Sequence, residues 1–137
     1  MKAMIATAAA LTLVACASTA TTIPDNVPVE TRDTSLGTIL TDEDGMTLYL
    51  YTRDDKGVSN CYDRCAQNWP PLEASSNAQG AGKFSVIERR DGTHQWAYEG
   101  DPLYLWVNDQ EPGDVTGQGV GDVWFVIEAD SSGGMSY

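Results

Sequence analysis

Along most of the chain, apolar and polar residues alternate with a period of two, which is the pattern of β-strands. Strands are predicted in six segments: 38–40, 47–51, 83–88, 93–98, 103–107 and 123–127. Turns rich in Asp and Gly separate several of them, at 42–45, 90–92 and 99–102. The one helix predicted is short, residues 60–68, because Pro70 and Pro71 follow it closely. The pattern predicts an all-β fold, mainly antiparallel, with one short helical turn.

A short motif occurs twice in the chain, at 49–54 and at 104–109. Each copy reads Tyr, any residue, an aromatic residue, two further residues and Asp. The motif positions are Tyr49, Tyr51 and Asp54 in the first copy and Tyr104, Trp106 and Asp109 in the second. The interval between Trp69 and Trp124 is the same as that between the two copies. A constant offset between matching residues indicates an internal duplication, with repeats at about 35–73 and 83–128.

The two repeats are predicted to share one hydrophobic core, because a repeat of this length buries too little surface alone. We expect their hairpins, 38–51 and 93–106, to superimpose and to pack about a pseudo-twofold axis. The motif strands are apolar on both faces, so they are expected to lie at the centre of a sheet. Their leucines are expected to face the core between the repeats. Their aromatic residues are expected to form either a second packed layer or an exposed platform for a polymer or partner protein.

Residues 1–15 have the pattern of a secretory signal peptide, in which the apolar stretch is too short to span a bilayer. The four residues that end at Cys16, Leu-Val-Ala-Cys, resemble a bacterial lipobox, whose cysteine becomes the lipid-carrying first residue of the mature protein. An ordinary signal peptide cut a few residues later is the alternative. A lipidated Cys16 anchors the chain without a spanning helix. Ala17 after it, rather than Asp, favours the outer membrane, facing periplasm or exterior.

Segment 16–34 is rich in Thr, Pro and acidic residues, so a flexible tether is predicted there. The duplicated β domain is predicted over 35–130, followed by a tail at 131–137. The chain has 20 acidic and eight basic residues and a formal net charge of −12, which argues against nucleic acid as a partner. The acidic loops at 42–44 and 109–114 lack the spacing of an EF-hand calcium site and are interpreted as solvated turns.

Cys61 and Cys65 remain as a pair once Cys16 is lipidated, in a compartment that oxidises thiols. A structural disulfide is therefore predicted between them. The alternative is a redox couple or a soft-metal site, since thiolates bind Cu(I) and Zn(II) well. A metal site needs further ligands, and His94 is the sole histidine of the chain. No metal or other cofactor is predicted.

Asp54 and Asp109 end the two copies of the motif. In the simpler interpretation, each carboxylate accepts backbone N–H groups of the turn after its strand, and repetition of the position favours this role. Alternatively, the two aspartates form a paired-carboxylate site with Tyr49 and Tyr104, as in glycoside hydrolysis. The sequence contains neither a Gly-x-Ser-x-Gly nucleophile elbow nor a phosphate-binding loop. An enzyme is therefore not expected.

Several short segments resemble those of a known family, the bacterial predicted lipoproteins with the Y-x-[FWY]-x-x-D motif, also called the secreted repeat of unknown function. The segments that carry the resemblance are 45–49 with Asp54, 60–66, 69–72, 90–93, 95–96, 100–104, 112–114 and 123–124. The resemblance covers essentially the whole domain. It implies a secreted protein with tandem repeats and carries no settled activity. Similar proteins often have His after the last Trp, where this chain has Phe125, so a metal role that rests on that histidine is not expected.

The sequence thus predicts a lipid-anchored protein of the bacterial envelope with a non-catalytic role in binding or in envelope structure. Its expected partners are the membrane, through Cys16, and an envelope protein or polymer. The alternative function is that of a metal-binding or redox lipoprotein that uses Cys61 and Cys65.

Overall fold

The computed structural model describes residues 22–129. The predicted signal peptide, Cys16, the first part of the tether and the tail at 131–137 lie outside these residues. The elements follow in the order β1 (Val29–Thr34), β2 (Gly37–Asp42), β3 (Tyr49–Tyr51), α1 (Arg64–Asn68), β4 (Glu73–Ala74), β5 (Phe84–Glu88), β6 (His94–Tyr98), β7 (Asp101–Pro102), the 3-10 turn η1 (Val120–Asp122) and β8 (Trp124–Val126). No helix in the described range is long and apolar enough to cross a membrane.

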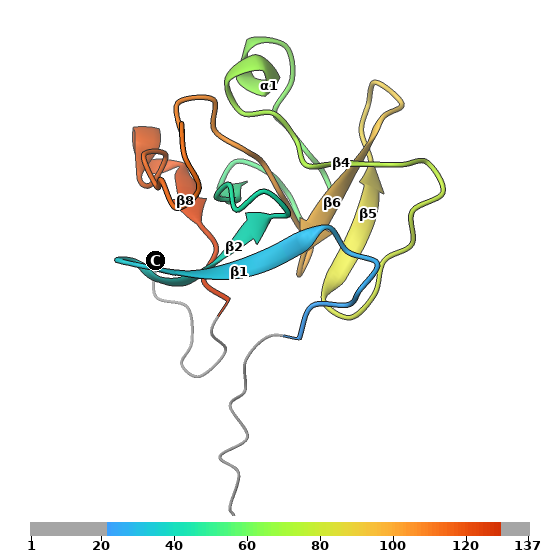
Figure 1. Ribbon diagram of the computed structural model, residues 1–137. Coiled ribbons are helices and arrows are strands. Elements are labelled where there is room, and N and C mark those ends of the chain that lie inside the picture. The colour runs from blue at the N-terminus through green and yellow to red at the C-terminus, as the bar shows by residue number, and fades with distance from the viewer. Residues whose placement is uncertain (1–21, 130–137) are drawn as a thin grey trace, which may run out of the picture.

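Antiparallel pairing organises the strands into three groups (Figure 1). β1 pairs with β2, and β3 pairs with β8. β6 lies between β4 and β5 and also pairs with β7. Within the described residues, helical structure is limited to α1 and η1. The predicted fold class, mainly antiparallel β with one short helix, is confirmed.

The folded domain begins earlier than the sequence predicts. A tether that reaches residue 34 is wrong at its end, because β1 pairs with β2 along its whole length, from Val29 opposite Asp42 to Thr34 opposite Gly37. Val27 and Val29 also pack in the core. The pattern of β1 conceals the strand, because Val29 is its single buried residue and the other five are exposed or half-buried. An edge strand with polar side chains resembles a linker in sequence.

The helical segment is also shorter than predicted. α1 begins at Arg64, whereas the sequence predicts a helix from residue 60. Asp63 stands before it with a φ of 53°, in the left-handed region through which a right-handed helix does not continue. Cys61 therefore lies outside the helix and Cys65 inside it.

The centre of the fold is a backbone pair between the two motif tyrosines. The Tyr49 N–H donates to the Tyr104 carbonyl oxygen over 2.8 Å, and the Tyr104 N–H donates to the Tyr49 carbonyl oxygen over 3.0 Å. On the outer sides of this pair, Val126 lies opposite Tyr49 and Pro71 lies opposite Tyr104. The interval between Pro71 and Val126 equals that between the two copies of the motif, which we call the motif offset. The repeats are thus related by a pseudo-twofold axis between the tyrosines. The predicted strand 103–107 is wrong, because Tyr104 forms isolated bridges to Tyr49 and Pro71 just beyond β7. Both tyrosines are central in the fold, as predicted.

Two turns differ in length between the repeats. The turn between β5 and β6 is one residue longer than the turn between β1 and β2, and the turn that follows β6 is one residue shorter than the turn that follows β2. Asp33 pairs with Thr38 in the first repeat, whereas Glu88, the counterpart of Asp33 at the motif offset, pairs with His94. The offset between β2 and β6 is therefore one position larger than that of the motif. The next turn is one residue longer in the first repeat, so the motif offset is restored at the central strands. A gapless alignment of the repeats is consequently wrong by one position for β2 and β6.

Two clusters of buried residues fill the space between the strands. The first cluster includes the motif-strand leucines Leu48, Leu50 and Leu103, as predicted. The second cluster is mostly aromatic and contains both motif tyrosines together with Trp69 and Trp124. Alternating side chains of the motif strands thus serve two packed layers. Of the two alternatives for the aromatic residues, the packed layer is correct for these four.

Candidate functional site

The two copies of the motif exchange hydrogen bonds across the pseudo-twofold axis. The Tyr49 hydroxyl donates to Asp109 Oδ2 over 2.7 Å, and the Tyr104 hydroxyl donates to Asp54 Oδ2 over 2.6 Å. Each tyrosine therefore binds the aspartate of the other repeat. This exchange explains the fixed spacing within the motif, because the tyrosine lies in the central backbone pair and the aspartate lies in the loop beyond it.

The second oxygen of each aspartate accepts hydrogen bonds from the loop that follows. Asp54 Oδ1 accepts the Asn60 N–H over 2.7 Å. Asp109 Oδ1 accepts the Thr116 N–H over 3.0 Å and the Thr116 hydroxyl over 2.6 Å. The predicted role of both aspartates as acceptors of backbone N–H groups is confirmed. Each aspartate in addition fastens its own loop to the opposite repeat, through bonds that a charged acceptor strengthens.

Four aromatic rings form one continuous stack across the repeat interface, in the order Tyr51, Trp124, Trp69 and Trp106. The indoles of Trp124 and Trp69 are parallel to within 2°, with their centroids 3.9 Å apart. Tyr51 stacks on Trp124 at 4.2 Å, and Trp106 stacks on Trp69 at 3.9 Å. We call these four residues the aromatic stack. The aromatic position of each motif copy thus packs on the tryptophan of the other repeat.

The inner and outer rings of the aromatic stack differ in exposure. Trp69 and Trp124 are buried, with 5% and 4% of their surface exposed. Tyr51 and Trp106 are half-buried. The alternative of an exposed aromatic platform is thereby reduced to these two end rings.

Both motif tyrosines contact the aromatic stack with their rings. The Tyr49 ring lies 5.3 Å from that of Trp69, and the Tyr104 ring lies 5.2 Å from that of Trp124, both in edge-to-face geometry. Such contacts are favourable because the positive edge of one ring meets the negative face of the other. Each tyrosine thus binds the opposite repeat through its hydroxyl and its own repeat through its ring.

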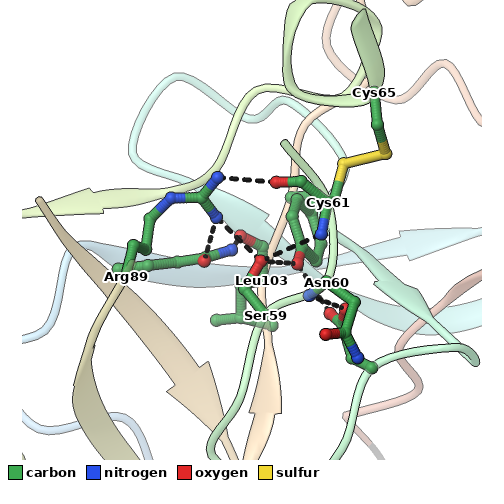
Figure 2. Close-up of a disulfide and its surroundings, with 9 residues drawn as sticks. Ser59, Asn60, Cys61, Cys65, Arg89 and Leu103 are labelled. Carbon is green, nitrogen blue, oxygen red and sulfur yellow. Dashed lines mark hydrogen bonds between the residues drawn. A yellow bond between two sulfur atoms is a disulfide. The ribbon is translucent and has the colours of Figure 1, made fainter. Parts of the chain in front are cut away.

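A buried arginine distinguishes the Tyr104 side of the interface (Figure 2). Arg89 is 4% exposed and donates from Nη1 to Ser59 Oγ over 2.8 Å and to Gln95 Oε1 over 2.7 Å. Its Nη2 donates to the Cys61 carbonyl oxygen over 2.6 Å. Ser59 Oγ lies 2.6 Å from the Tyr104 hydroxyl oxygen. Because the N–H groups of Arg89 and Cys61 both donate to Ser59, the serine proton is left to donate to Tyr104.

Sequence reasoning missed Ser59, Arg89 and Gln95. At the motif offset, Thr34 is the counterpart of Arg89, and Ile39 takes the place of Gln95 in the register of β2. Since a comparison of the repeats selects what they share, it passes over residues that break the symmetry. These differences between the repeats are the signal that could have identified the residues: the second repeat has an arginine and an amide where the first has Thr and Ile.

On the Tyr49 side, a backbone group replaces the serine. The Gly117 N–H donates to the Tyr49 hydroxyl oxygen over 3.1 Å. A Cβ atom on Gly117 would lie 2.7 Å from atoms of the Tyr49 ring. The glycine therefore allows the loop to approach the tyrosine closely.

Burial controls the protonation of these groups. Removal from water raises the pKa of Asp54 to about 6, although the hydrogen bond from Tyr104 and the nearby charge of Arg89 lower it. Burial, reinforced by the bond to Asp109, raises the pKa of Tyr49 far above the ordinary tyrosine value. The pKa of Tyr104 is raised in the same way, by burial and then by its bond to Asp54. At neutral pH, Asp54 is therefore a carboxylate and both tyrosines are neutral donors.

Cys61 and Cys65 form the predicted disulfide (Figure 2). Cys61 is fully buried and Cys65 is half-buried. The bridge ties the loop that carries Ser59 and Asn60 to α1, and the Cys65 carbonyl oxygen accepts the Trp69 N–H over 2.7 Å. Among the described residues, no group of three or more His, Cys, Asp or Glu side chains is placed to hold a metal ion.

The other candidates from the sequence have local roles. Asp42 Oδ1 accepts two backbone N–H groups of its own turn, and Asp114 Oδ2 does the same in the second acidic loop. His94 lies in β6, with Ala74 on one side and Glu88 on the other. These residues are thus part of turns and strand pairs.

One open groove, with a volume of about 480 Å³, lies beside β4. Its lining residues are Asp25, Asn26, Pro28, Glu43, Glu73, Ala74, Ser75, Ala78, Gln79 and Trp96. Neither the motif residues nor the disulfide cysteines belong to this lining. The groove is therefore separate from the motif residues and the disulfide.

Comparisons with known proteins support the duplication. A family described as a secreted repeat of unknown function matches the chain twice, over residues 30–73 and 85–128. The first match starts within β1, in keeping with the early beginning of the domain. Neither a search of curated proteins nor a search of solved structures found a match. Because the two matches cover most of the fold, the chain belongs to the family of secreted repeats of unknown function.

Proposed function

We propose that this chain is a lipid-anchored module of the bacterial envelope with a non-catalytic role in binding or in envelope structure. The observation that carries the proposal is the exchange of hydrogen bonds between the motif copies. Carboxylates and hydroxyls that acid–base chemistry would need are engaged in holding the repeats together. In the described part of the chain, every buried side-chain nitrogen and oxygen atom has a hydrogen-bond partner. Such a satisfied network favours a rigid scaffold over a site that binds and converts a substrate.

The proposed anchor is a lipid on Cys16, which would hold the domain at the outer membrane. Residues 17–26 lie between this cysteine and Val27, the first residue of the core. Ten residues span at most about 35 Å when fully extended. The domain would therefore stay close to the membrane surface, where partners are envelope proteins or polymers.

The proposed contact surface is the pair of half-buried rings at the ends of the aromatic stack, Tyr51 and Trp106. Val107, next to Trp106, is 51% exposed and extends the apolar surface there. An aromatic ring that is fixed on the core at one face and open to solvent elsewhere suits a polymer or protein partner.

The lipid anchor is tested by growing cells with an alkyne-labelled fatty acid. The full-length protein should carry the label, and Cys16→Ala should remove it. The variant Cys61→Ala/Cys65→Ala is the matched control and should keep it. Label that survives Cys16→Ala would contradict the anchor.

The binding role is tested by co-sedimentation of the full-length protein with isolated peptidoglycan. Binding should be lost in Tyr51→Ala/Trp106→Ala and kept in Val58→Ala, which changes an exposed apolar residue elsewhere. Equal binding by both variants would show that the end rings are not the contact. No sedimentation of the wild type would leave the structural role as the better description.

The alternative role, a metal or redox function of Cys61 and Cys65, rests on the half-buried position of Cys65. Metal analysis of the protein as purified, together with a count of free thiols, separates the two functions. Stoichiometric copper or zinc with two free thiols supports the alternative. An oxidised pair without metal supports the structural disulfide.

A further inference from the structure

The aromatic stack joins two half-exposed rings to two buried tyrosines whose hydroxyls are bonded to carboxylates. We propose that this arrangement is a path for one-electron transfer, in which an oxidising equivalent taken up at an end ring passes through the indoles to a Tyr–Asp pair. This activity goes beyond the binding or structural role and does not depend on it.

The continuity of the stack is the first observation behind this proposal. Aromatic pairs in proteins commonly adopt offset or edge-to-face geometry. Here three successive contacts have centroids 3.9 to 4.2 Å apart and planes within 22° of parallel. Electron transfer between rings weakens steeply with distance, so an unbroken series of close contacts favours it. Trp and Tyr are also among the side chains that lose one electron most readily.

The second observation is the charge around the buried end of the path. Oxidation of an indole creates a positive charge, which a low-dielectric interior disfavours unless negative charge lies nearby. The Tyr104 ring contacts Trp124, and the Tyr104 hydroxyl donates a hydrogen bond to the Asp54 carboxylate. A path that ends at this pair can lose the positive charge by moving a proton to Asp54.

The proposed step balances in electrons and protons. A soluble one-electron oxidant takes an electron from Trp106 and is itself reduced. Trp69 then gives an electron to Trp106, and Trp124 gives one to Trp69, so that the missing electron is now that of Trp124, the ring in contact with Tyr104. Tyr104 supplies the last electron, and its hydroxyl proton moves along the 2.6 Å hydrogen bond to Asp54. The products are a neutral tyrosyl radical, a protonated carboxyl group and restored indoles.

The surroundings of Tyr104 suit this proton transfer. The Ser59 hydroxyl donates to the Tyr104 oxygen and continues to do so after the proton has left. Arg89 fixes Ser59 from the other side, over 2.8 Å. Burial gives Asp54 a pKa of about 6, so its carboxylate is a stronger base than an exposed one.

The test uses the full chain with Tyr51, Tyr62 and Tyr137 replaced by Phe. Since the chain has six tyrosines, this background retains Tyr49, Tyr98 and Tyr104, all of them buried. Half-buried Trp106 is then the point at which the oxidant takes an electron. Flash-generated tris(bipyridine)ruthenium(III) serves as the oxidant. Transient absorption and electron paramagnetic resonance then distinguish tryptophan from tyrosyl radicals. We expect a tryptophan radical first and a tyrosyl radical afterwards.

Two variants locate the radical. Tyr49→Phe/Tyr104→Phe in this background should abolish the tyrosyl signal and leave the tryptophan radical, because the rings remain and the hydroxyls are lost. Tyr98→Phe is the matched control, because Tyr98 is buried against Phe84 in the first cluster, away from the stack. It should leave the tyrosyl yield unchanged. A tyrosyl signal that persists in the double variant, or is lost in the control, would overturn the proposal.

Two further variants locate the path. Trp106→Leu should abolish radical formation in the core, whereas Trp96→Phe, which changes the one tryptophan outside the stack, should not. Asp54→Asn tests the proton acceptor without altering the stack and should reduce the yield at Tyr104. Absence of a tyrosyl radical in the background protein, whose aromatic stack keeps its shape, would refute the path even if a core variant fails to fold.

Discussion

The two Tyr–Asp pairs have the same geometry and different support. In both, the hydroxyl of a central tyrosine donates to a carboxylate of the other repeat over 2.6 to 2.7 Å. The Tyr104–Asp54 pair is supported by side chains, Ser59 and Arg89, and by the adjacent disulfide. The Tyr49–Asp109 pair is supported mainly by the backbone and hydroxyl of one loop.

The difference shows which contacts the duplicated architecture requires. The hydroxyl–carboxylate bonds and the ring contacts are present in both halves, so they define the interface between the repeats. The supporting groups differ: Ser59, held by the buried Arg89, donates to the Tyr104 oxygen, and the Gly117 backbone N–H donates to the Tyr49 oxygen. Each arrangement satisfies the tyrosine oxygen with a donor. The two halves should therefore respond differently to substitutions behind the pair.

The largest expected effect is that of Arg89→Ala. It leaves acceptors on Ser59, Gln95 and Cys61 without their charged donor, so we expect a loss of about 3 kcal/mol in unfolding free energy. Thr34→Ala, at the matching position of the first repeat, should cost less than about 1 kcal/mol. Urea unfolding monitored by circular dichroism measures both values. Equal losses would contradict the asymmetry.

The next effect is that of removing the disulfide. Cys61→Ala/Cys65→Ala should lower the unfolding free energy by about 2 kcal/mol, as loop closure of this length predicts. Thermal unfolding of the full-length protein checks this. A reducing agent should destabilise the wild type and leave the double variant unaffected. Sensitivity of the variant to the reductant would show that another process is being observed.

A smaller effect concerns pH. Burial raises the pKa of Asp54 from its ordinary value of 3.8 to about 6 in the folded protein, so the folded state binds the proton more tightly than the unfolded state. Its contribution to stability therefore increases as pH falls from about 6 to about 4, and is absent above pH 6. With allowance for partial exposure, we expect a gain of about 1 to 2 kcal/mol.

The variant Asp54→Asn should lose this pH-dependent gain, and Asp109→Asn should keep it. Among charged groups, Arg89 lowers the pKa of Asp54 and Asp101 raises it. Unfolding curves collected between pH 4 and pH 7 test the difference. A gain that is unchanged in Asp54→Asn would assign it to another acid.

The smallest effect is that of Thr116→Val, which removes the hydroxyl that donates to Asp109 over 2.6 Å. The loss should be about 1 kcal/mol, because the backbone N–H bond remains. Thr93→Val removes an equally short bond to Asp91 at the exposed turn and should change stability much less, because water replaces the lost hydroxyl. Chemical unfolding compares the two. The same cost for both would remove the distinction between a buried and an exposed acceptor.

The sequence predicted the features that the repeats share. The constant offset between the motif copies indicated the duplication, the two-faced strands indicated their central position, and the cysteine pair indicated the disulfide. One interpretation of the sequence grouped the motif aspartates with Tyr49 and Tyr104. Which tyrosine binds which aspartate was not predictable, because the exchange across the axis depends on how the repeats face each other. Spacing within one copy carries no information about that arrangement.

Other failures have local physical causes. β1 was concealed because five of its six side chains are not buried, so its pattern lacks apolar alternation. The predicted helix start at residue 60 was wrong because Asp63 has a positive φ. The composition of the segment does not predict this backbone conformation. Arg89 was missed because it belongs to one repeat alone. Comparison of the repeats thus identifies residues that both repeats keep and does not identify residues, such as Arg89, that only one repeat has.

The parallel indoles of Trp69 and Trp124 give the protein an intrinsic optical probe. Chromophores in contact at this separation couple their electronic transitions, which produces paired bands of opposite sign in circular dichroism. Each indole belongs to a different repeat, so the paired bands require that the two halves be docked. Their disappearance during unfolding therefore reports separation of the halves directly, without any added label.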